Sequence, residues 1–270
     1  MAADLTETAP LEQPAPEPAP EKPAFKPLHR RRFLFLYTLL AVVLAAAVAG
    51  VVLEEGSSVT GSAAWSTWKP SAGGISAARQ IAAHVAPEYR LPSGKQLVDV
   101  IAKAPSVSPG SQQIPVHYLA VRGSGGSGDR ISDVSSSNTV MFSLCGLGAS
   151  CSIATGTASV ARGRLVRREI LELALYTFKY VDGIENVIAF MPPRPGAQPE
   201  YVVYLQESDL SAQLDEPLAD TLGPKTPLPN TIPAREVRVV DATTESRVYA
   251  FSLSQAQQGD AILVLAPLPS

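Results

Sequence analysis

Few side chains in this sequence could carry out chemistry, and its two cysteines are the clearest of them. Cys145 and Cys151 stand six positions apart in the segment CGLGASC, with two glycines between them. A glycine-rich segment of this length can close into a tight loop, so we predict a structural disulfide at the end of a strand. A redox-active pair is the alternative, although the usual C-x-x-C spacing is missing. Two cysteines with no histidine nearby do not make a zinc site.

Two histidines, His84 and His117, follow the first 53 residues and could act as bases. A triad of His117 with a serine and Asp129 or Asp133 would require the fold to bring these groups together. His84 lies near the end of a predicted helix, which is typical of an exposed or hydrogen-bonded histidine. We therefore predict no catalytic residue, no metal site and no cofactor. A hydrolase that uses His117 or a thiol at Cys145 is the alternative.

The glycine-rich segment 123–128, GSGGSG, formally matches the dinucleotide-binding pattern G-x-G-x-x-G. A dinucleotide site needs the last glycine to open a helix whose N-terminus receives the pyrophosphate. The chain instead continues as DRISDVSSSN, which is typical of turns and loops. We therefore interpret the segment as a surface loop.

Four arginines crowd the first two turns of the best predicted helix, residues 161–181. They are Arg162, Arg164, Arg167 and Arg168. Positive charge at a helix N-terminus opposes the helix dipole, so this arrangement needs a reason. The arginines could bind an anionic group or a partner, for example a lipid phosphate or a wall polymer. We expect instead that they pair with Glu169, Glu172 and acids elsewhere in the chain, because charge runs usually form a solvated face.

The helix predicted over 161–181 has one wide apolar face, which should lie across a sheet. A narrow polar stripe is left for water on its other side. The residues of that stripe are Arg168, Glu169, Glu172, Tyr176 and Lys179.

The remaining patterns predict an α+β fold with a mostly antiparallel or mixed sheet covered by this one long helix. A first helix is expected over 75–85 because apolar residues recur there at spacings of three and four. A helical turn is expected within 214–222. Strands are expected over 96–102, 114–121, 138–145, 186–191, 200–206, 236–241, 247–253 and 260–266, with a hairpin across 242–246.

Residues 33–53 form an uncharged apolar run of 21 residues, long enough to cross a hydrocarbon core of about 30 Å as a helix. Arg30, Arg31 and Arg32 precede the run, and Glu54 and Glu55 follow it. Positive charge stays on the cytoplasmic side, so we predict a single-pass protein of the cell membrane with a cytoplasmic N-terminus and an extracytoplasmic C-terminal domain.

The predicted span divides the chain into four parts. Residues 1–32 hold seven of the 24 prolines and should be a disordered cytoplasmic tail. Residues 33–53 are the transmembrane helix in contact with the lipid bilayer. Residues 54–74 read as a stalk, although its Trp65 and Trp68 could anchor the start of the folded domain. Residues 75–270 form the extracytoplasmic domain.

A cleaved product is the alternative to an anchored one. The sequence AVA before Gly50 has the small-x-small form of a signal-peptidase site. The apolar run continues for four residues through Leu53, which favours an uncleaved anchor. Cleavage between Ala49 and Gly50 would release the domain as a secreted protein.

The part that follows the span carries 20 acidic and 17 basic residues, so it lacks the basic surface that a nucleic-acid partner requires. Three stretches, WSTWKP, YRLPSGKQLVDV and RLVRREILELALYTFKYVDGIENVIAFMPP, resemble conserved actinobacterial single-pass membrane proteins of uncharacterised function. The resemblance implies this topology and brings no catalytic residue. We expect a non-catalytic domain that binds an envelope protein or polymer, because the sequence holds no dense cluster of titratable residues.

Overall fold

The computed structural model of the chain describes residues 64–107, 114–123, 130–255 and 260–268. These residues belong to one compact unit. The predicted tail, the predicted span and cleavage site, and the glycine-rich segment 124–128 lie outside the described residues. No helix among the residues that are described is both long and apolar enough to cross a membrane.

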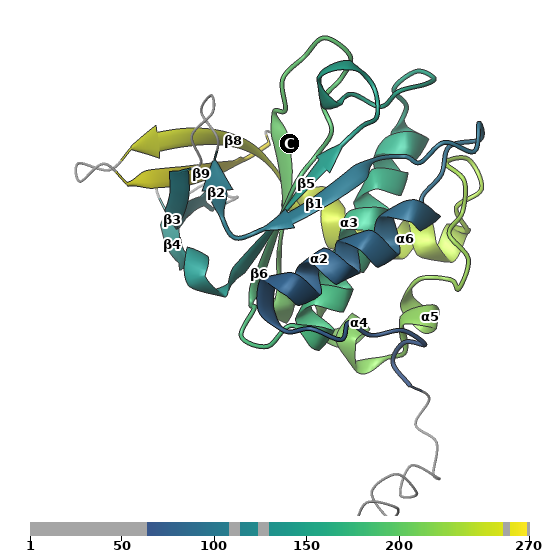
Figure 1. The fold of residues 1–270 in the computed structure, drawn as a ribbon, viewed down its shortest axis with the longest axis horizontal. Coiled ribbons are helices and arrows are strands. Elements are labelled where there is room, and N and C mark those ends of the chain that lie inside the picture. Colours follow the sequence, from purple (N-terminus) through teal and green to yellow (C-terminus); the bar gives the residue numbers. More distant parts are fainter. Residues whose placement is uncertain (1–63, 108–113, 124–129, 256–259, 269–270) are drawn as a thin grey trace, which may run out of the picture. The chain divides into compact units, whose positions relative to one another are not determined.

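The described part of the chain has an α+β fold built on a mixed, nearly closed sheet of nine strands (Figure 1). The strand order is β1-β5-β6-β7-β8-β9-β3-β2, and β4 also pairs with β3. The pairs β5–β6 and β3–β9 are parallel and the others are antiparallel. The strands are β1 Asp99–Lys103, β2 Ser106–Val107, β3 Ile114–Arg122, β4 Ile131–Ser135, β5 Thr139–Cys145, β6 Asn186–Phe190, β7 Tyr201–Gln206, β8 Val248–Gln255 and β9 Ala261–Pro267.

Helices cover one face of the β1-β5-β6-β7 half of the sheet, while β3, β4, β8 and the far part of β9 extend away from them (Figure 1). The helices are α2 Gly74–Val85, α3 Val160–Tyr180, α4 Ser211–Asp215, α5 Leu218–Thr221 and α6 Ala234–Thr244. Short 3-10 turns at Ala86–Glu88, Ser136–Asn138, Ala149–Cys151, Glu207–Leu210 and Glu245–Arg247 join these elements.

Two hydrophobic cores follow from the alternation of side chains along the central strands. Phe142 and Val187 point toward the helices and belong to the larger core, which includes most of the apolar residues of α3. Met141 and Ile188, each one residue away, point to the opposite face and pack in a second core with Leu263 and other residues of β3 and β9. Successive side chains of a strand alternate between faces. The sheet therefore curls so that its β3–β9 part covers the face that the helices leave open.

Local sequence explains where α3 begins and ends. The Oγ of Ser159 accepts a hydrogen bond from the backbone N–H of Arg162, which caps the helix start. The helix ends where Val181 adopts an extended conformation, and Gly183, left-handed with φ of 73°, lies in the turn that follows. The predicted helix over 161–181 is confirmed within one residue at each end.

The predicted strand over 236–241, and the hairpin predicted from it across 242–246, are wrong, because this segment is helix α6. Glu236, Val240 and Thr244 are buried at intervals of four residues, which is the spacing of one helix face. Three valines among five residues favour a strand locally, but burial of this helical face against α3 outweighs that preference.

The polar stripe of α3 that the sequence assigns to water is also mostly buried. Arg168, Glu169 and Tyr176 lie among the buried residues. Helices α2 and α6 both pack against α3, so most of the stripe faces other helices, while Lys179 is exposed. The sheet is thus covered by several helices, where the sequence predicts one.

Trp65 and Trp68 are partly buried and pack against the larger core. The Trp68 ring stacks on His84 at 4.0 Å between ring centroids, and Trp65 meets Tyr176 edge to face at 5.4 Å. Part of the range predicted to be a stalk, from residue 65 onward, therefore contacts the folded unit.

Candidate binding pocket at the start of helix α3

A pocket of about 420 Å³ opens where α3 begins, between the segment that follows the cysteines and the connector between β6 and β7. Ligand sites typically have volumes of roughly 300–1,000 Å³. Its lining residues are Ile153, Gly156, Ala158, Ser159, Arg162, Gly163, Val166, Met191, Pro192, Pro193, Arg194, Pro195, Ala197, Gln198, Glu200 and Tyr201.

The β6–β7 connector forms an apolar wall of this pocket. Pro192, Pro193 and Pro195 lie in it, together with Met191. Proline has a fixed φ and no backbone N–H. This wall is therefore stiff, and its prolines cannot donate hydrogen bonds to a ligand.

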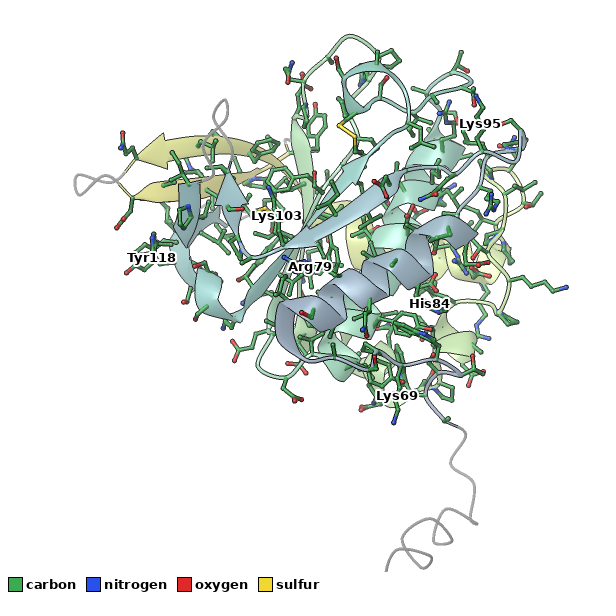
Figure 2. The ribbon with its side chains drawn as sticks, in the orientation of Figure 1. Lys69, Arg79, His84, Lys95, Lys103 and Tyr118 are labelled. Atoms are coloured by element: carbon green, nitrogen blue, oxygen red, sulfur yellow. A yellow bond between two sulfur atoms is a disulfide. The ribbon has the colours of Figure 1, made fainter. Side chains whose placement is uncertain are left out.

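The disulfide holds the segment that leads to the opposite wall. Cys145, the last residue of β5, is bonded to Cys151, with their Cα atoms 4.4 Å apart (Figure 2). Within this loop the N–H of Gly146 donates to the carbonyl oxygen of Cys151 at 2.7 Å. A Cβ on Gly146 would lie 2.1 Å from the carbonyl oxygen of Ser152, so the tight loop requires glycine there. Ile153 of the pocket follows directly, and its position depends on this loop.

Arg162 is the charged residue buried in the pocket wall. It exposes 9% of its surface, and its Nη1 donates to the carbonyl oxygen of Thr157 at 2.7 Å. Its Nε is buried, and no described residue accepts a hydrogen bond from it. No Asp or Glu of the described residues lies within ion-pair distance of Arg162, and burial lowers the pKa of its guanidinium. A buried cation without a counter-ion is thus part of the pocket.

Gly156 leaves room for that guanidinium. A Cβ on Gly156 would lie 3.0 Å from Nη1 of Arg162, and the φ of 76° at this residue also favours glycine. A second cavity of about 490 Å³ shares Gly156, Ser159 and Arg162 with the first. Arg162 therefore borders open space on more than one side.

The N-terminus of α3 adds to the positive potential here. Ser159, Arg162 and Gly163 all line the pocket, so the first turn of this helix of 21 residues borders it. The first N–H groups of an α-helix have no intrahelical partner and carry a partial positive charge. No acidic residue lies in the first turn of α3. The pocket thus joins an apolar interior to a site suited to an anion.

The other arginines of the predicted cluster have partners within the chain. Nη2 of Arg164 and Nη2 of Arg167 lie 2.8 and 2.5 Å from carboxylate oxygens of Asp241 in α6. Hydrogen bonds from Arg164 and Arg167 lower the pKa of Asp241. For these two arginines, the structure supports pairing with acids of the chain.

Arg168 lies six residues beyond Arg162 and is almost completely enclosed, with 1% of its surface exposed. Its Nε lies 2.5 Å from an oxygen of Glu236, and its Nη1 lies 3.2 Å from an oxygen of Glu172. Nη1 also donates to the hydroxyl of Tyr89 at 2.5 Å, and Nη2 donates to the carbonyl oxygen of Gly223. Every nitrogen of this guanidinium therefore has an acceptor.

Glu169, next to Arg168, is the opposite case. It is fully buried, and neither of its carboxyl oxygens has a hydrogen-bond partner among the described residues. Burial, with a smaller contribution from the charge of Glu172, raises the pKa of Glu169 well above its usual range. The expected pairing of the arginines with Glu169 is absent among the described contacts, and the raised pKa favours the neutral form of this carboxyl group.

The residues suggested for hydrolysis are not brought together. Cys145 is in a disulfide and has no thiolate to act as a nucleophile. His117 is 55% exposed, and its nearest acidic partner is Asp260 at 3.9 Å, while Asp129 lies outside the described residues. Among the residues that the structure describes, no cluster of His, Cys, Asp and Glu could hold a metal ion.

Comparison of this chain with protein-family models, with curated proteins and with solved structures finds no match. The resemblance to actinobacterial membrane proteins therefore stays a prediction, and the functional argument depends on the geometry of the pocket.

Proposed function

We propose that this protein is a membrane-anchored, non-catalytic binding domain of the cell envelope. In this proposal residues 1–32 lie in the cytoplasm, residues 33–53 cross the bilayer, and the folded unit lies outside. The charges that flank the apolar run support this orientation. The disulfide supports it too, because disulfides persist in extracytoplasmic compartments.

The ligand binds in the pocket at the start of α3, and Arg162 is the observation that carries this proposal. A charge buried without a partner costs free energy. The other three arginines of the cluster have acidic partners, so the chain can supply counter-ions in this region. A ligand from an envelope protein or polymer would supply the missing counter-ion. It would thereby offset the free-energy cost of burying the Arg162 charge.

Crosslinking in intact membranes tests the binding function. A photo-reactive amino acid at Gln198, on the pocket wall, should give an adduct with the full-length chain. Arg162→Met should remove the adduct, whereas Arg164→Met should keep it, because Arg164 pairs with Asp241 and does not line the pocket. An adduct of equal yield in all three proteins would argue against binding at this pocket.

Fractionation tests the anchor separately. We expect the full-length chain in the membrane fraction, with residues 1–32 protected from protease added outside. A soluble product that begins at Gly50 would show that the protein is secreted and not anchored.

A further inference from the structure

We propose that the pocket at the start of α3 takes an organic monoanion, a carboxylate joined to an apolar group, such as the free C-terminal end of a peptide. This inference rests on the proposed binding function and names the chemical class of the ligand.

The charge of the pocket matches a ligand with one negative charge. Its charged lining residues are Arg162, Arg194 and Glu200, so its formal net charge is +1. Arg194 and Glu200 are exposed and are screened by water and salt, whereas Arg162 is buried and is screened much less. One carboxylate beside Arg162 would neutralise the buried charge.

The hydrogen-bond donors of Arg162 also suit a carboxylate. A guanidinium has five N–H donors in a plane, and in the described structure Nη1 donates to one acceptor, the carbonyl oxygen of Thr157. A carboxylate accepts two parallel N–H bonds from such a group. Arg162 Nε is already removed from water without a partner, so a small shift that brings an acceptor to it would satisfy a group that is otherwise left unpaired.

The rest of the pocket favours an apolar substituent over a strongly hydrated dianion. Ile153, Val166 and Met191 line it, and the prolines of the β6–β7 connector offer no N–H groups. A phosphate dianion would lose its hydration against these walls and would find one buried cation. An apolar side chain attached to the carboxylate would gain by the same burial.

Calorimetric titration of the full-length chain in detergent, with two matched probes, tests the ligand class. The probes are the peptide acetyl-Ala-Leu with a free carboxylate and the same peptide with a C-terminal amide. A charge-assisted hydrogen bond contributes about 1.5–3 kcal/mol, so the carboxylate should bind at least about tenfold more tightly. Inorganic phosphate should bind more weakly than the carboxylate peptide.

Three variants show where and how the probes bind. Arg162→Met should remove the preference for the carboxylate, and Arg164→Met, the same change two residues along, should retain it. Met191→Trp should fill the pocket and weaken both peptides. Thermal melting of each variant checks that it is folded, so that lost binding is not lost structure.

The possible failures are distinguishable. If the acid and the amide peptide bind equally and Met191→Trp abolishes the binding of both, the proposal that the ligand is a carboxylate is wrong. The pocket would still be a binding site. Tighter binding of phosphate would overturn the carboxylate proposal in favour of an inorganic or phosphoryl anion. Absence of binding by either peptide would also overturn it, and the crosslinking experiment at Gln198 would then decide whether the pocket binds anything.

Discussion

Two buried arginines on one helix, Arg168 and Arg162, have opposite surroundings. Arg168 lies between Glu172 and Glu236 and also donates to the Tyr89 hydroxyl. Among the described residues, the Arg162 guanidinium has one carbonyl acceptor and a buried Nε without a partner, and a pocket lies beside it. The first environment is complete within the chain, whereas the second, in our proposal, is completed by an anion from outside. We infer that Arg168 serves the fold and that Arg162 serves binding.

The largest effect that this comparison predicts is on stability. Arg168→Met leaves Glu172 and Glu236 without their cation, and breaking a buried ion pair typically costs about 3–5 kcal/mol. Arg162→Met removes a cation that has no counter-ion, so its free energy of unfolding should change by less than about 1 kcal/mol. Urea unfolding of the two variants measures the difference in the free energy of unfolding. Equal losses of stability would contradict the different roles of Arg168 and Arg162.

Loss of the disulfide should have the next largest effect on stability. This bond lies beside the segment that leads to the pocket wall. Replacing both Cys145 and Cys151 by serine opens a loop with a sequence separation of 6. Loss of the loop constraint on the unfolded chain should cost about 2 kcal/mol. Because Ile153 follows this loop, binding at the pocket should weaken too. A variant with unchanged stability and unchanged binding would show that the bond does not hold this wall.

Substitution of Glu169 should change the stability in the opposite direction. Glu169→Met replaces a buried carboxyl that lacks partners by an apolar chain of similar length, so it should stabilise the fold by about 1–2 kcal/mol at pH 7. The check is the urea midpoint. A loss of stability would mean that Glu169 has a partner in solution, such as a buried water.

The pH dependence of this gain follows from the raised pKa of Glu169. Between its usual pKa of about 4.5 and its higher pKa in the folded state, the carboxyl ionises in the unfolded chain but stays neutral in the fold, so rising pH favours unfolding over this range. Below that pH both states are protonated and the penalty disappears. The difference between wild type and Glu169→Met should therefore grow as pH rises above 4.5 and shrink below it; Glu172 and Arg168, which lie nearby, are the same in both proteins.

The smallest effect is expected at the partly exposed pair between Arg164 and Asp241. Asp241→Asn should cost about 0.5–1 kcal/mol at pH 7, because such pairs are screened by solvent. The lowered pKa of Asp241 means that its contribution is present above its usual pKa and is lost as pH falls through the lower folded value. Acid denaturation curves of wild type and the variant should converge at low pH, and curves that stay parallel would contradict the role of this pair.

The sequence predicts the frame of the fold because its local signals are strong. Helix α3 and strand β5 lie within a residue of their predicted bounds, since their apolar periodicity is long and their ends carry turn residues. The sequence predicts a strand where α6 lies, because the valines of this segment have β propensity. The helix forms because Glu236 and Val240 are buried against α3, a contact that local sequence does not reveal.

The four clustered arginines at the start of α3 stand out in the sequence, but their separate roles do not. Tyr89, Glu236 and Asp241 lie 68 to 79 positions from the arginines that they contact, so no spacing along the chain indicates the pairs. The proline-rich connector is recognisable as stiff, yet its place as a pocket wall depends on the β6–β7 pairing. Which arginine lacks a partner follows from the tertiary fold alone.

The central claim is that Arg162 binds an anion, whereas the other arginines of α3 are paired within the chain. Its most direct test is the NMR signal of the Arg162 guanidinium. In a ¹H–¹⁵N spectrum of the full-length chain, its Nε resonance can be identified by its loss in Arg162→Met, and that of Arg164 by its loss in Arg164→Met. Addition of acetyl-Ala-Leu with a free carboxylate should shift the Arg162 resonance and leave that of Arg164, which is paired with Asp241, in place. An unchanged Arg162 resonance at saturating peptide would contradict the account.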